Sequence, residues 1–96
     1  MEVKTVRIGK WDIPTKMVED YVKARIMGDS YLMGKGEVPS GTQYERGQRW
    51  QLCVMQQIKI HGEICGALGI PYSEEYTDEF YRVFMDYVNK QVKLKG

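Results

Sequence analysis

The chain lacks the features that would place it in several specialised classes. No run of residues approaches the roughly 18 consecutive apolar positions of a membrane-spanning helix. The first residues have no apolar core of signal-peptide type. The 14 basic and 13 acidic residues leave a net charge of +1, without the basic excess of a general nucleic-acid binder. We therefore expect a soluble, cytoplasmic protein with no membrane partner.

Cysteine and histidine are scarce, with two cysteines and one histidine. Cys53 and Cys65 fall on one predicted helix, about 18 Å apart along its axis, whereas a disulfide needs Cα atoms within about 7 Å. His61 and Cys65 have the i, i+4 spacing of two metal ligands, but a zinc site needs three or four. We expect free thiols, a hydrogen-bonded His61 at the edge of the core, and no metal or other cofactor.

Residues 1–96 are expected to form a single domain. Residues 3–8 are rich in β-branched side chains and predict a short strand, paired with residues 31–33 or with the same strand of another subunit. Apolar residues at helical spacing predict helices at residues 14–27, at about residues 43–68 and after residue 73. The predicted fold is mainly α, with a small α+β fold left open: a short N-terminal β-strand followed by three helices.

Capping residues set the predicted helix boundaries. Gly28 is expected to end the first helix, because glycine adopts the left-handed conformation that follows many helices. A capping-box pattern at residues 42–45 starts the long central helix, and Gly69 stops it. Ser73 is expected to cap the third helix, whose start is acidic and whose end is basic, as the helix dipole favours.

The central helix is apolar on nearly all sides, from Trp50 to Leu68. A helix that is apolar all round is buried all round, and two shorter helices and a strand offer too little cover. We therefore expect a homo-oligomer built through this helix. Gly62 and Gly66 each cost about 1 kcal/mol relative to alanine, which favours close helix–helix packing at these two positions, inside or between subunits.

The segment from residue 28 to residue 50 carries the predicted binding site. It contains five glycines and three cations, and long irregular connections in compact domains are usually functional. Arg46 and Arg49 share a face in the first two turns of the central helix, where a bound anion would relieve their repulsion from the helix dipole. The cations neutralise charge and the aromatic rings stack in the predicted ligand site, which comprises Arg46, Arg49, Lys35, Tyr44, Trp50 and Tyr31.

No nucleophile–base pair is visible, and residues 36–42 lack the lysine of a nucleotide-hydrolase phosphate loop. The sequence therefore predicts a non-enzymatic module that binds a phosphate-bearing small ligand, such as a nucleotide or cyclic nucleotide. Two alternatives stay open: a protein-interaction module or inhibitor of a host protein, and a small nucleic-acid-binding protein. Small intracellular chains of this kind are common among phage and mobile-element accessory proteins, although no residue points to that origin specifically.

Overall fold

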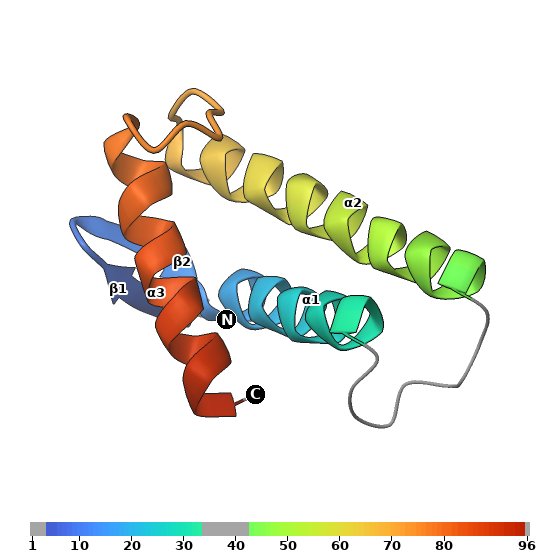
Figure 1. Ribbon diagram of the computed structural model, residues 1–96. Coiled ribbons are helices and arrows are strands. Elements are labelled where there is room, and N and C mark those ends of the chain that lie inside the picture. Colours follow the sequence, from blue (N-terminus) through green and yellow to red (C-terminus); the bar gives the residue numbers. More distant parts are fainter. Residues whose placement is uncertain (1–3, 34–42, 96) are drawn as a thin grey trace.

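The computed structural model describes residues 4–33 and 43–95, with the backbone alone at residues 31–33 and 43–46 (Figure 1). Within these ranges, a two-stranded hairpin precedes three helices. The elements are β1 (Thr5–Ile8), β2 (Trp11–Pro14), α1 (Thr15–Met33), α2 (Gln43–Leu68) and α3 (Glu79–Lys95). The predicted mainly α fold with a small β part is confirmed.

The first strand pairs with the residues that follow it directly. β1 and β2 are antiparallel, with Val6 opposite Ile13 and Ile8 opposite Trp11. Gly9, at φ 61°, supplies the left-handed residue that a two-residue hairpin turn requires. The predicted pairing of β1 with residues 31–33 is wrong, because this turn folds the chain back at once and residues 31–33 belong to α1. Pairing of β1 with another subunit stays a prediction.

Helix α1 continues beyond its predicted stop at Gly28 and reaches Met33. A Cβ atom at Gly28 would lie 3.2 Å from the Cβ atom of Cys53 on α2. The glycine therefore allows α1 and α2 to approach closely instead of ending α1. Much of the connection predicted for residues 28–50 is helical, since residues 28–33 and 43–50 belong to α1 and α2.

Helix α2 has the predicted bounds of residues 43–68. At its end the Gly69 amide donates to the Gly66 carbonyl at 3.3 Å, and the Ile70 amide donates to the Cys65 carbonyl at 3.0 Å. These two bonds form a Schellman motif. Gly69 has the positive φ, 68°, that this motif needs, so its predicted role as the stop is confirmed.

Helix α3 begins at Glu79, six residues beyond the predicted cap. The Ser73 hydroxyl instead accepts a hydrogen bond from the Glu75 amide, which closes a local turn. Asp78 is the cap, because its carboxylate accepts a hydrogen bond from the Tyr81 amide at 3.0 Å. Asp78 is the more effective cap because its carboxylate satisfies an exposed amide of the first turn.

The core lies where α1, α2, α3 and the hairpin meet. Phe84, Ile13, Ile64 and Val88 are its largest fully buried side chains. Figure 1 shows α1 and α2 side by side, with α3 and the hairpin at the end of α2 nearest its C-terminus. The core is therefore concentrated around the second half of α2.

The first half of α2 carries large apolar side chains that are exposed in the single chain. Leu52, Met55 and Ile58 are 64%, 59% and 47% exposed. α3 and the hairpin cover only the second half of α2 (Figure 1), and burial of the remainder by a second subunit stays a prediction. No helix in the described part of the chain is long and apolar enough to cross a membrane.

Candidate functional site

The predicted phosphate-ligand site lies only partly within the described side chains. Lys35 is outside the described residues, and only the backbone is described for Tyr31, Tyr44 and Arg46. Arg49 and Trp50 are exposed near the start of α2, and the Trp50 ring lies 3.8 Å from the place a Cβ atom would take at Gly28. Binding of a phosphate-bearing ligand here stays a prediction.

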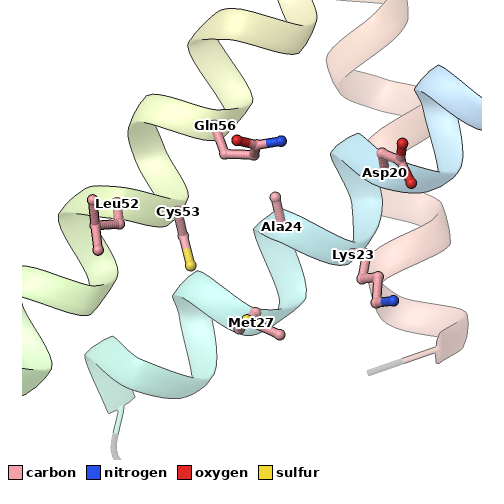
Figure 2. Close-up of a pocket in the computed structure, with 7 residues that line it drawn as sticks. All are labelled: Asp20, Lys23, Ala24, Met27, Leu52, Cys53 and Gln56. Atoms are coloured by element: carbon pink, nitrogen blue, oxygen red, sulfur yellow. The ribbon is translucent and has the colours of Figure 1, made fainter.

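A groove of about 410 Å³ runs between α1 and the first half of α2. Figure 2 shows Cys53 and Ala24 pointing across it, while Lys23 points away from α2. Its lining is Asp20, Lys23, Ala24, Met27, Leu52, Cys53 and Gln56. Leu52 and Met27 are both largely exposed, so this groove adds apolar surface to the uncovered half of α2.

A second hollow, which we call the His61 cavity, has a volume of about 180 Å³. It lies on the side of the α1–α2 pair that α3 covers. Three segments line it: α1, α2, and the chain from residue 74 into α3. The lining residues are Tyr21, Arg25, Val54, Gln57, Ile58, His61, Glu74, Tyr76, Tyr81 and Met85. Both charge signs and several phenols therefore converge on one small space.

His61 is the one buried polar residue of the described core, at 2% exposure. Aromatic rings surround it, with the Tyr72 and Tyr81 centroids 4.5 and 5.4 Å from the imidazole. Among the described residues, no hydrogen-bond partner reaches its Nε2 atom. The expectation of a buried histidine is met, but the expected hydrogen bond is absent at this nitrogen.

Burial lowers the pKa of His61, and the nearby carboxylates of Glu74 and Asp78 only partly oppose this. The imidazole is therefore neutral at physiological pH. A neutral imidazole has one donor nitrogen and one acceptor nitrogen. An unpaired buried nitrogen costs about 1–3 kcal/mol, so Nε2 is a destabilising feature of the described core.

Tyr21 brings a second poorly paired polar group to the same cavity. Its side chain is 5% exposed, and its ring meets Phe84 edge to face at 5.0 Å between centroids. The hydroxyl donates to the Met85 Sδ atom at 3.8 Å, and a thioether is a weak acceptor. Burial, followed by the neighbouring Tyr81, raises the pKa of Tyr21 to about 12, so the phenol keeps its proton.

Charged side chains of opposite sign border the cavity. Arg25 forms an ion pair with Asp29 at 3.5 Å, and its side chain is 35% exposed. Glu74 accepts a hydrogen bond from the Tyr72 hydroxyl. Burial, followed by Tyr76 and the Glu74 carboxylate, raises the pKa of Tyr81, and the Arg25 guanidinium partly opposes this, so both charges act on this one phenol. The cavity thus offers a cation from α1 and an anion from the segment before α3.

Sequence reasoning missed the His61 cavity because its parts come from three distant segments. A signal was nevertheless present. Tyr21 and Arg25 are four residues apart on α1, and Gln57 and His61 are four residues apart on α2. Polar pairs at this spacing share one helix face, and here both pairs interrupt largely apolar faces.

The uncovered side of α2 forms a third feature, which we call the outer face. It consists of Leu52, Met55, Lys59, Gly62 and Gly66, which recur at helical spacing. Nothing in the described part of the chain lies within 4 Å of the place a Cβ atom would take at Gly62 or Gly66. Close packing inside the subunit therefore does not explain either glycine.

The residues of the described ranges provide no cluster of three His, Cys, Asp or Glu side chains that could hold a metal ion. Cys53 and Cys65 are free thiols on α2. A scan against protein-family models and searches of curated proteins and solved structures found no match. The function of the chain is therefore inferred from its own geometry.

Proposed function

We propose that this protein is a non-enzymatic protein-interaction module that pairs with a second copy of itself through the outer face of α2. The observation that carries the proposal is the division of this face into two halves. Leu52 and Met55 are large and exposed, whereas Gly62 and Gly66 leave open space. The two halves have complementary shapes.

The spacing of these residues favours an antiparallel pair of α2 helices. Leu52 and Gly66 lie symmetrically about the turn that contains Lys59, and so do Met55 and Gly62. If two copies cross antiparallel at this turn, each large side chain meets a glycine of the other copy. A parallel pair would instead place Leu52 and Met55 against themselves and leave the glycines facing one another.

The charges on this face do not distinguish the antiparallel arrangement from the parallel one. Lys59 and Glu63 are both exposed and lie one turn apart on α2. In the antiparallel pair, Lys59 of one copy lies opposite Lys59 of the other, and Glu63 of that copy is one helix turn, or about 5.4 Å, further along the axis. Such exposed pairs contribute only about 0.2–1 kcal/mol each, so the orientation depends on the shapes of the two halves of the face.

Burial of the apolar residues provides the main driving force. Full burial of a leucine or methionine side chain contributes about 1.5–3 kcal/mol. Each copy contributes both Leu52 and Met55, which are 64% and 59% exposed in the single chain. Glycine at positions 62 and 66 lets the helix backbones come close, as in small-residue helix contacts generally.

Sedimentation velocity of wild-type protein and a matched set of variants tests the proposal. Met55→Glu places a charge where the Met55 side chain would pack against Gly62 of the second copy, and it is expected to give a single chain of 11.2 kDa. Leu94→Glu is the control, because Leu94 is 79% exposed on α3, away from this face. The control is expected to sediment as a dimer, like the wild type.

Two results would contradict the proposal. One is a wild-type protein that remains a single chain at micromolar concentration. The other is a Met55→Glu protein that still sediments as a dimer. If the wild type is a single chain that binds an unrelated protein, and Met55→Glu abolishes that binding, the outer face is still an interaction surface. Its partner is then that protein and not a second copy of this chain.

A further inference from the structure

Residues 70–78 form an irregular segment that joins α2 to α3 (Figure 1), and we call this segment the cover. Its Tyr72 ring packs on the His61 imidazole at 4.5 Å between centroids. The rings of Phe80 and Phe84, on α3, are stacked with the imidazole at 6.2 and 6.3 Å. His61 is therefore enclosed between the rigid core of α3 and a segment without regular structure.

The cover is held to the rest of the molecule by few buried groups. None of its residues is buried, and Tyr72 and Tyr76 are 44% and 62% exposed. In the described part of the chain, its side chains form hydrogen bonds only over two or three residues, as between the Ser73 hydroxyl and the Glu75 amide at 3.2 Å. Segments with few buried contacts open locally at a lower free energy than the core.

A proton on His61 is unfavourable while the cover is closed. The residue is 2% exposed, and its Nε2 atom has no hydrogen-bond partner among the described residues. Both nitrogens of a protonated imidazole carry hydrogen, so Nε2 would become a buried donor without an acceptor on a charged ring. Burial of such a charge costs much more than burial of the neutral ring. Once the cover moves away, water solvates the charge.

The charged groups around His61 do not cancel this effect. Arg25 on α1 lines the same cavity and has the sign of a protonated imidazole. Burial lowers the pKa of His61, and the carboxylates of Glu74 and Asp78 only partly oppose this. The other titratable neighbours are phenols and a thiol, which carry no charge near pH 6. They are Tyr21 on α1, Cys65 on α2, Tyr72 and Tyr76 in the cover, and Tyr81 on α3.

We propose that residues 70–78 are a pH-sensitive cover, which opens as the His61 imidazole takes up a proton. An imidazole in water has a pKa of about 6.5, so the proton binds to the open form and shifts the population toward it. The ratio of open to closed chains then rises by up to about tenfold for each pH unit below about 6.5. The cover contains no residue of the outer face of α2, so this switch does not depend on the dimer.

Native-state amide hydrogen exchange of the full chain, followed by NMR, tests the proposal. The Ile70 amide reports on the cover, because its hydrogen bond to the Cys65 carbonyl, at 3.0 Å, breaks when the cover leaves α2. The Val22 amide, at a buried position of α1, reports on global unfolding. After correction for the intrinsic pH dependence of exchange, Ile70 is expected to be less protected than Val22 at each pH.

The protection of Ile70 is also expected to fall about 25-fold from about pH 7 to about pH 5, because one proton with a pKa of about 6.5 binds to the open form. Most carboxylates stay ionised above about pH 5, so this range isolates the effect of the histidine.

Two variants remove the pH dependence by different routes. His61→Phe keeps an aromatic ring but removes the titratable group. Tyr72→Ala, at an exposed position, uncovers the imidazole, which then takes up a proton without further opening. In both variants the protection of Ile70 is expected to change less than about threefold over the same pH range. Tyr76→Ala is the matched control, because Tyr76 belongs to the same cover but its ring packs on Tyr81 at 5.2 Å between centroids. It is expected to keep the wild-type pH dependence.

Three results would overturn the proposal. Equal protection of Ile70 and Val22 at every pH would mean that His61 is uncovered only by global unfolding. A constant protection of Ile70 in the wild type over this pH range would mean that opening is not linked to a proton. A Tyr72→Ala protein with the wild-type pH dependence would assign that dependence to a group other than His61, and this variant decides the question if His61→Phe does not fold.

Discussion

Substitutions at Gly62 separate the stability of the single chain from the strength of the dimer. Glycine in a helix interior costs about 1 kcal/mol relative to alanine. In the described residues, no atom lies within 4 Å of the place a Cβ atom would take at Gly62. Gly62→Ala should therefore stabilise the single chain by about 1 kcal/mol, which corresponds to a rise of about 4–8 °C in melting temperature for a domain of this size.

A large side chain at position 62 is expected to weaken the dimer. In the antiparallel pair, Gly62 faces Met55 of the second copy. Gly62→Leu overfills that space at both symmetry-related contacts, and overpacking costs about 1–3 kcal/mol at each, a combined loss of roughly 30- to 20,000-fold in affinity. The single chain should tolerate this leucine, because the position is open.

Urea unfolding in the Met55→Glu background measures the effect on the single chain. Sedimentation of the same Gly62 substitutions in the wild-type background measures the effect on the dimer. The reasoning is refuted if Gly62→Leu leaves the dimer intact, or if Gly62→Ala destabilises the single chain by more than about 1 kcal/mol. Either result would mean that Gly62 has neighbours other than those proposed.

Three further predictions concern other parts of the chain. If the start of α2 binds a phosphate-bearing ligand, Arg46→Ala and Arg49→Ala should each weaken nucleotide binding by about 1.5–3 kcal/mol; equal melting shifts for variant and wild type with nucleotide would oppose this. Because burial lowers the pKa of His61, the unfolded chain takes up this proton more readily, so the free energy of unfolding should fall as the pH drops below about 6.5. His61→Phe should reduce this fall in the free energy of unfolding, as measured by urea titrations above and below about pH 6.5. An unchanged pH dependence would count against a neutral buried His61. Phe84→Ala should lose about 3–5 kcal/mol, because Phe84 is 0% exposed, and a melting temperature close to wild type would show that Phe84 is not a core residue.

The central helix was predictable because its start and stop depend on local chemistry. A capping-box pattern stands at residues 42–45, and Gly69 carries the positive φ of the Schellman motif. Gly28 misled the prediction, since glycine is also used where two helices approach closely. The 3.2 Å approach to Cys53 depends on tertiary packing, which the spacing of apolar residues does not reveal.

The other two errors in the fold came from competing local signals. Ser73 is a good helix cap by type, but its hydroxyl closes a turn with the Glu75 amide, and Asp78 caps α3 instead. The hairpin was missed because β2 is only four residues long and ends in Pro14. Proline is tolerated there because β2 is an edge strand.

The candidate sites were predictable to different degrees. The sequence indicated the unusual glycines of α2, and the structure shows that Gly62 and Gly66 are on its outer side. The His61 cavity was not predictable, because its hydrogen-bonding groups come together only when α1, α2 and α3 are packed. The polar pairs Tyr21/Arg25 and Gln57/His61 could be seen in the sequence, but the sequence does not show that the two pairs line one cavity.

The most direct test of the proposed function is the mass of the wild-type protein by sedimentation equilibrium across a range of micromolar concentrations. The outer face of α2 predicts twice the single-chain mass of 11.2 kDa, with reversible dissociation on dilution. A mass of 11.2 kDa at every concentration would contradict self-association through α2.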